Sequence, residues 1–140
     1  MHFKNLLTGE TIQNAISNSS GSVAWANDNR TVFYTSKNDV TLLSEKIWRH
    51  KLGSDSKSDK MVYHEKDDTF YNGVYRSKSG DYIIIYNQST LVSDFHILNA
   101  DKPDGDFVNF SPREKEHEYS IDHYQDKFLS LIHISEPTRP

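Results

Sequence analysis

The sequence predicts an all-β protein: a partial β-propeller of about two four-stranded blades, with parts of the neighbouring blades on either side. Short runs rich in β-branched and aromatic residues recur along the 140 residues, and turn residues bound each run. The runs fall into groups of four that restart after roughly 45 to 50 residues, a period typical of propeller blades. A β-sandwich would instead show evenly spaced strands without this grouping.

The first group begins with two strands around a tight turn. Val23–Trp25 and Thr31–Thr35 are rich in β-branched and aromatic residues, and the Asn/Asp-rich segment Asn27–Arg30 separates them. We therefore expect a strand, a turn and a second strand at the start of this group.

The next strand, Ile47–Leu52, alternates with a period of two, which is typical of a half-buried strand. The side chains expected on its buried face are Trp48, His50 and Leu52. An alternative helix is suggested by the i, i+4 spacing of Leu43 and Ile47. That pattern is too short to sustain a helix, so the strand is the favoured interpretation.

A polar stretch leads to Met61–His64, which completes the first group. The second group opens with Gly73–Tyr75 and a turn at Lys78–Asp81. Its next strand, Tyr82–Tyr86, is apolar on both faces, which indicates a central strand of a sheet that is covered on two sides. The group ends with the strand Asp94–Leu98, the turn Asp101–Asp106 and the strand Phe107–Phe110.

A third group begins with Tyr119–Tyr124 and a turn at Gln125–Asp126. Equivalent positions of successive groups, such as Trp25 and Tyr75, are about 50 residues apart. One propeller repeat cannot bury both faces of its own sheet, so it needs a neighbouring repeat on each side. Because the third group is incomplete and only a short segment precedes the first, we expect a piece of a larger propeller that is cut at both ends.

Composition excludes several classes of function. Formal net charge is −4, with 16 basic and 20 acidic residues interleaved, so we expect no nucleic-acid footprint and no basic face for a membrane. There is no cysteine, and hence no disulfide or thiolate chemistry. No apolar run approaches the roughly 20 residues of a transmembrane helix, and the first residues do not match a secretory signal. A cytoplasmic location is expected.

No catalytic residue is expected in this chain. A hydrolase serine is exposed by a sharp strand-to-helix turn with the pattern G-x-S-x-G, and the sequence does not contain this string. Gly21-Ser22 and Gly53-Ser54 lack the second glycine. We interpret both as ordinary turns.

No metal site or cofactor is expected either. His50, His96 and His123 fall on expected strands, where packing explains them, and His117 and His123 are six residues apart, which matches no common zinc spacing. The segment Asp101–Asp106 lacks the spacing and the bidentate Glu of an EF-hand calcium loop. We interpret it as a turn between two strands.

Two charge clusters, Glu65–Asp68 and Arg113–Glu118, lie between the groups. Such clusters are usually solvated rims. The alternative is that they face another domain or the central tunnel of a propeller, where they would meet cationic substrates. Reversing the charges of Glu116 and Glu118 in a longer parent enzyme tests this alternative, because it predicts altered kinetics on Arg-containing peptides at low salt. The substrate-binding residues themselves stay unassigned.

Four segments carry a resemblance to a known family. They are VAWANDNRTVFY, VTLLSEKIWRHKLG, HEKDDTFYNGVYRSKSGDYI and PREKEHEYSIDHYQDKF. Over Leu7 to Phe128 the chain resembles the propeller domain of the oligopeptidase B branch of the prolyl oligopeptidase family of serine peptidases. The most specific matches are Trp48–His50 and His117–Tyr124.

The resemblance implies a two-domain parent enzyme. A seven-bladed propeller would cap an α/β-hydrolase domain with a Ser-Asp-His triad, and the enzyme would cleave short peptides after Arg or Lys. The propeller would be non-catalytic and would gate substrate entry. The expected partners are therefore the hydrolase domain and short peptides, and we expect no turnover from this chain alone.

The pattern changes at Leu129. Residues 129–140 spell LSLIHISEPTRP, which resembles the translation of a transposase adapter used in short-read DNA library preparation. We therefore expect residues 1–128 to be the family segment and residues 129–140 to be a non-native tail. The alternative is a genuine strand, since Leu129, Leu131 and His133 occupy alternate positions.

Two other classes of function stay open. One is a free-standing propeller-type binding module without enzymatic activity, for which the small number of blades is a difficulty. The other is a small structural β-protein that assembles from several copies. Its exposed sheet edges, Thr8–Ile12 and Tyr119–Phe128, would then pair between copies.

Overall fold

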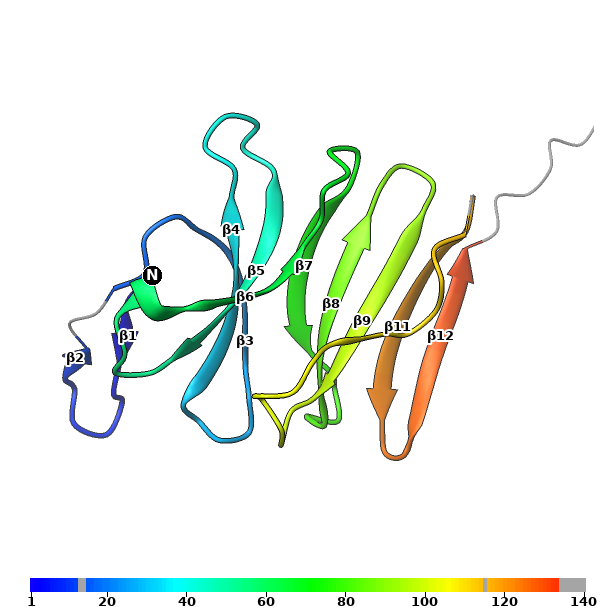
Figure 1. Cartoon of the computed structure of the whole chain (residues 1–140). Helices are drawn as coiled ribbons and strands as arrows, with labels where there is room; N and C mark the ends of the chain where they lie inside the picture. The colour runs from blue at the N-terminus through cyan, green and yellow to red at the C-terminus, as the bar shows by residue number, and fades with distance from the viewer. Residues whose placement is uncertain (13–14, 115, 134–140) are drawn as a thin grey trace, which may run out of the picture.

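The computed structural model describes residues 1–12, 15–114 and 116–133, and it shows successive antiparallel sheets arranged side by side (Figure 1). The first is a small sheet of β1 (Phe3–Lys4) and β2 (Thr11–Ile12). Three larger units follow in chain order. This confirms the all-β, propeller-type grouping expected from the sequence.

The first four-stranded sheet, called blade 1 here, contains each strand next to its sequence neighbour. A short 3-10 turn, η1 (Ser56–Ser58), separates its last two strands. The strands of blade 1 are β3 (Ser19–Trp25), β4 (Thr31–Lys37), β5 (Ser44–Lys51) and β6 (Lys60–His64).

The second four-stranded sheet, blade 2, repeats the same order, and a two-stranded third sheet follows it. The strands of blade 2 are β7 (Tyr71–Arg76), β8 (Tyr82–Gln88), β9 (Ser93–Asn99) and β10 (Val108–Asn109). The third sheet pairs β11 (Glu118–Tyr124) with β12 (Lys127–His133). Four strands, four strands and the start of another unit are the predicted pattern.

The turn between β3 and β4 is fixed by one carboxylate. Asp28 accepts hydrogen bonds from the backbone N–H groups of Arg30 and Thr31, at 2.9 and 2.8 Å. Asn29, which follows Asp28 directly, has a left-handed backbone (φ 57°), which asparagine tolerates better than most residues. The expected Asn/Asp turn is therefore present, with a specific side chain closing it.

Strand β8 lies between β7 and β9 and is buried on both faces, as its sequence predicts. Ile83 and Ile85 belong to the core shared with blade 1, whereas Ile84 belongs to the core shared with the third sheet. All three are fully buried. A continuous apolar run was needed here because both faces of the strand are covered by a neighbouring sheet.

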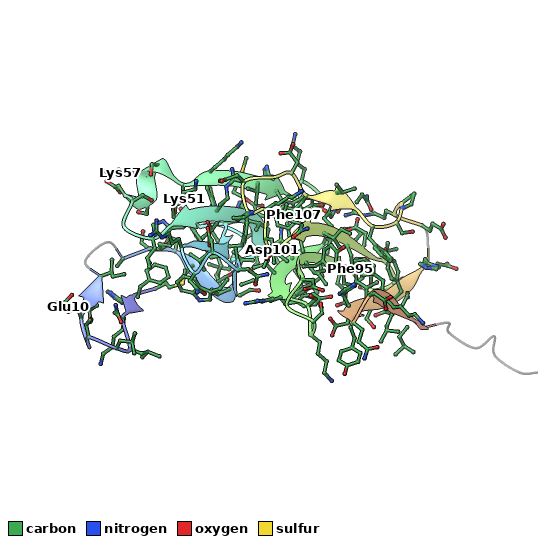
Figure 2. All side chains as sticks on the ribbon, turned by 90° about the horizontal axis from the view of Figure 1, so that it is seen from below. Glu10, Lys51, Lys57, Phe95, Asp101 and Phe107 are labelled. Atoms are coloured by element: carbon green, nitrogen blue, oxygen red, sulfur yellow. The ribbon has the colours of Figure 1, made fainter. Side chains whose placement is uncertain are left out.

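The core between blades 1 and 2 is continuous across the two sheets. Phe33 and Ile47 of blade 1 pack with Val74 and Ile83 of blade 2. Phe107 covers this core, with its ring edge-to-face against Phe33 at a centroid distance of 5.4 Å. Figure 2 shows Phe107 where the two blades meet. Neither blade could bury these side chains alone.

Several expected boundaries are wrong in detail. Gly21 and Ser22 are not a turn but lie within β3, at an irregularity where Gly21 takes φ 93°. The strand favoured over a helix at Leu43 to Ile47 is confirmed, although β5 begins earlier than expected, at Ser44. The edge expected at Thr8–Ile12 shrinks to the two residues of β2, and the strand expected at Phe107–Phe110 shrinks to the two residues of β10.

The end of the described chain forms a strand. β12 pairs with β11 throughout, with Leu129 opposite Asp122 and Leu131 opposite Ser120. The side chains of Leu129 and Leu131 are exposed. The expected boundary between residues 128 and 129 stays a prediction, because strand pairing reveals nothing about the origin of the coding sequence.

Candidate functional site at the blade interfaces

One end of the interface between blades 1 and 2 carries an ionic cluster. Nη2 of Arg113 lies 2.6 Å from Oε2 of Glu65, and Nε of Arg113 lies 2.6 Å from Oδ2 of Asp94. Glu65 directly follows β6, Asp94 lies on β9, and Arg113 lies on the connector from β10 to β11. Its guanidinium carbon also lies 3.7 Å from the centre of the Phe70 ring. A single side chain therefore joins blade 1, blade 2 and the segment that enters the third sheet.

Neutral groups complete the hydrogen bonding of the two carboxylates. The side-chain amide of Asn87 donates to Oδ1 of Asp94 at 2.5 Å and to the Tyr63 hydroxyl at 2.8 Å. The Tyr63 hydroxyl in turn donates to Oε2 of Glu65 at 3.0 Å. Buried carboxylates require such partners, because removal from water is costly for an ion.

Hydrogen bonds and nearby charges keep Glu65 and Arg113 ionised. Burial alone would raise the pKa of Glu65, but hydrogen bonds from Arg113, from the Asp67 N–H and from Tyr63 outweigh burial and hold that pKa below its ordinary value. Burial opposes the charge of Arg113 as well, yet Glu65 and Asp94 raise the pKa of the guanidinium. Burial and the nearby Glu65 carboxylate raise the pKa of Tyr63, so its phenol stays neutral.

The interpretation of the charge clusters as solvated rims is therefore wrong for Glu65, whereas Arg113 keeps part of its side chain exposed and is nevertheless paired. Glu65 is 7% exposed, and Arg113 is folded over Phe70 onto the two carboxylates. Asp67 and Glu114 are exposed, as expected of a rim. A loop with alternating charges is typical of solvated side chains. The sequence alone does not show which oppositely charged residue lies nearby in space.

The opposite end of the same interface is held by the segment Asp101–Asp106. Oδ1 of Asp101 accepts a hydrogen bond from the Asn27 side chain at 2.7 Å. Arg49 donates to the carbonyl of Pro103 at 3.0 Å, and Lys51 lies 3.0 Å from Asp104. The segment is a turn, as predicted. The carboxylates of Asp101 and Asp104 contact separate partners on blade 1.

The histidines singled out in the sequence are held by separate partners, and they do not converge. Nδ1 of His50 lies 2.6 Å from Oδ1 of Asp59 in a buried pair, and Nδ1 of His123 lies 2.7 Å from the Ser79 hydroxyl. His96 packs on the Tyr63 ring at a centroid distance of 4.7 Å. His117 lies 3.7 Å from Glu114. His50, His96 and His123 lie on β5, β9 and β11, so their predicted place on strands is confirmed.

The first strands of successive sheets are joined by side chains. The Ser22 hydroxyl on β3 both donates to the carbonyl of Val74 and accepts from its N–H, each at 2.8 Å. The Tyr75 hydroxyl on β7 donates to the carbonyl of Ile121 on β11 at 2.6 Å. Sequence reasoning missed Ser22 and Arg113, and only the 50-residue repeat could have indicated that these segments lie at blade interfaces.

Successive four-stranded sheets, packed face to face and joined through their first strands, define a β-propeller-type protein. The family model described as "Prolyl oligopeptidase, N-terminal beta-propeller domain" matches residues 1–135, and the chain belongs to this family. Across the described residues, no helix is long and apolar enough to cross a membrane.

Relatives and solved structures agree with this assignment. The chain is 39% identical over 129 residues to dipeptidyl aminopeptidase BI of Pseudoxanthomonas mexicana, which covers 92% of this chain and 18% of that protein. It is 32% identical over 133 residues to protease 2 of Moraxella lacunata, and this match covers 94% of this chain and 19% of that protein. Oligopeptidase B from Leishmania major has a similar structure, with a TM-score of 0.81 at 26% identity over 91% of this chain and 18% of that one. The chain thus spans about a fifth of the length of these relatives.

Proposed function

We propose that this chain is part of the non-catalytic propeller domain of an oligopeptidase B-like serine peptidase, which gates the entry of short peptides that are cleaved after Arg or Lys. The observation that carries the proposal is the stack of blades with its ionic cluster, together with the likeness to oligopeptidase B at a TM-score of 0.81. The Ser-Asp-His triad would lie in an α/β-hydrolase domain elsewhere in a longer chain.

The proposed gating depends on a rigid ring of blades around the substrate passage. A closed ring of blades, seven in the resembling family, leaves only a narrow passage, and large folded proteins are kept from the reaction site. Contacts such as Arg113 with Glu65 and Asp94 hold blades together, so the passage does not widen at this interface. Short peptides reach the site, and bulk water is largely excluded from it.

Recovery of the longer reading frame from the same source provides the test. We expect a G-x-S-x-G string far downstream, and we expect the longer enzyme to hydrolyse a blocked Arg-amide reporter while the 140-residue chain does not. Arg113→Met in the longer enzyme should raise activity on long peptides relative to short ones. A frame that stops after a few more blades would support a free-standing binding module instead.

A second candidate is the removal of dipeptides from free N-termini. The relative with 39% identity is named a dipeptidyl aminopeptidase, and this favours the candidate. A dipeptide reporter with a free amino group and the same reporter with a blocked amino group distinguish the two activities. Preference for the free amino group supports dipeptide removal, whereas equal or better cleavage of the blocked reporter supports the oligopeptidase.

Two further expectations belong to this proposal. Raw nucleotide reads across codons 128 to 140 test whether residues 129–140 are encoded in the genome or derive from an adapter. The cytoplasmic location is tested by fractionating the source cells and detecting the longer protein in each fraction.

A further inference from the structure

We propose that the pocket between blade 2 and the third sheet binds one cationic side chain, the guanidinium or ammonium group of an Arg or Lys residue in a peptide. The inference rests on the proposed function only for the peptide as the carrier of this cation. Its volume is about 430 Å³, within the roughly 300 to 1,000 Å³ of small-ligand sites. Residues of β7, β8, β9 and β11 line it, together with Leu131 of β12, which belongs to the segment 129–140 that the sequence predicts to be a non-native tail.

Aromatic rings form the walls of this pocket. Tyr75, Tyr86 and Phe95 belong to blade 2, where Tyr86 lies opposite Phe95 in the β8–β9 register and 6.1 Å from Tyr75 between ring centroids. Tyr119 of the third sheet packs on Phe95 at a centroid distance of 5.0 Å. Figure 2 shows Phe95 beside the third sheet. Aromatic faces attract cations through their quadrupole, and a guanidinium group also stacks on them.

The position of Tyr86 depends on a glycine of the neighbouring strand. Gly73 lies opposite Tyr86 in the β7–β8 register, and a Cβ atom at Gly73 would overlap the Tyr86 ring. The ring therefore lies over the β7 backbone, between Tyr71 and Tyr75. Burial, and then Tyr71, raise the pKa of Tyr86, so its ring faces the pocket as a neutral phenol.

A carboxylate at the pocket supplies the charge that a cation needs. Oε1 of Glu118 accepts a hydrogen bond from the Gln88 side chain at 3.0 Å, and Oε1 of Gln88 accepts one from the Tyr71 hydroxyl at 3.1 Å. This chain of bonds orients Glu118. Glu118 itself lines the pocket, so its carboxylate faces a ligand that is held there.

Charge complementarity selects the ligand class. An anion would be repelled by Glu118. A purely apolar ligand would remove water from the carboxylate without replacing it, which is unfavourable. A cation on an apolar stem satisfies both parts of the pocket, because its stem contacts the rings while its head donates to the Glu118 carboxylate.

Titration of the 140-residue chain tests the inference directly. N-acetyl-arginine amide is added while the Tyr ring resonances are followed by NMR, and N-acetyl-citrulline amide, which has nearly the same shape without the charge, is the matched ligand. We expect saturable binding of the arginine compound that weakens with salt. Glu118→Gln, which keeps an acceptor for Gln88, should weaken binding about tenfold, as expected for the loss of one charged hydrogen bond.

Glu114→Gln is the control variant, since Glu114 is an exposed carboxylate on the neighbouring connector that lines no part of this pocket. It should bind like the unchanged chain. Circular dichroism melting shows whether each variant retains its fold. Equal binding of citrulline and arginine compounds, or unchanged binding by Glu118→Gln, overturns the inference. The readout involves no hydrolysis, so a longer enzyme without peptidase activity would refute the proposed function and leave this inference standing.

Discussion

Arg113 joins carboxylates that are 19 and 48 residues away in sequence. Its replacement by Met keeps the apolar stem over Phe70 but leaves two largely buried carboxylates without their cation. We expect a loss of about 3 kcal/mol in the free energy of unfolding, because an unpaired buried charge is costly. Urea denaturation at pH 7 measures this loss.

The control for Arg113→Met is Arg30→Met, the same substitution at an exposed residue. It should change the free energy of unfolding by less than about 0.5 kcal/mol. Adding Glu65→Gln and Asp94→Asn to Arg113→Met should restore part of the stability, since the unpaired charges are then gone. If Arg113→Met unfolds at the same urea concentration as the unchanged chain, the cluster does not stabilise the interface.

His96 gives the fold a pH dependence near neutrality. Burial lowers the pKa of His96 below its ordinary 6.5, although Asp94 opposes the shift. The unfolded chain therefore binds a proton at His96 more readily than the folded chain does. The stability linked to this residue is complete above about pH 6.5 and is lost as the pH falls through the folded pKa.

Urea midpoints between pH 8 and pH 5 check the effect of His96. We expect the midpoint to fall towards pH 5, and His96→Gln should make the fall shallower. His2→Gln, at an exposed residue, should leave the fall unchanged. An identical pH profile for His96→Gln and the unchanged chain would exclude His96 as its source.

At the scale of the strand, the pairing of Gly73 with Tyr86 shapes the face of blade 2. Gly73 is not in the left-handed region, so its backbone accepts alanine. We expect Gly73→Ala to cost about 1 to 3 kcal/mol because the added methyl group displaces the Tyr86 ring. In a Tyr86→Ala background the same change should cost nothing or stabilise the chain slightly. Thermal unfolding of the two single variants and the double variant measures this coupling, and equal costs in both backgrounds would locate the strain elsewhere.

The strands were predictable where their cause is local. Tyr82–Tyr86 forms a central strand because both of its faces are apolar, and Asn27–Arg30 forms a turn because Asp28 caps its own backbone. The repeat of strand groups every roughly 45 to 50 residues then predicted the order of the sheets along the chain. These features depend on residues that are close together in sequence.

The contacts between sheets were not predictable in the same way. Gly21 was expected in a turn because glycine commonly occupies turns, but β3 instead takes an irregularity there that brings Ser22 to Val74. Arg113 and Glu65 look like solvated charges when each is judged by its neighbours in sequence. Their pairing is set by how blade 1 packs on blade 2. A single sequence contains no local pattern that shows these two residues to be close in space.

At the scale of the molecule, blades 1 and 2 share one core, so they should unfold together. Phe33 of blade 1 is fully buried against residues of blade 2. Phe33→Ala should cost about 3 to 5 kcal/mol. Hydrogen exchange at the amides of β8 should accelerate together with that of β4, although no residue of blade 2 has changed.

Ile121→Ala provides the comparison for Phe33→Ala. Ile121 is buried in the separate core between blade 2 and the third sheet. Its truncation should accelerate exchange in β11 and β12 more than in β4. Unchanged exchange in β8 after Phe33→Ala would show that the blades unfold independently.

The position of Arg113 also has a consequence for biosynthesis. A ribosome makes Glu65 48 residues before Arg113, which corresponds to roughly 2 to 10 seconds of elongation. During this interval Glu65 and Asp94 lie on the nascent polypeptide without their cation. The ionic contacts between blades 1 and 2 can therefore form only after the ribosome has translated the connector that leads to the third sheet. Arg113 completes this interface late in the synthesis of the chain.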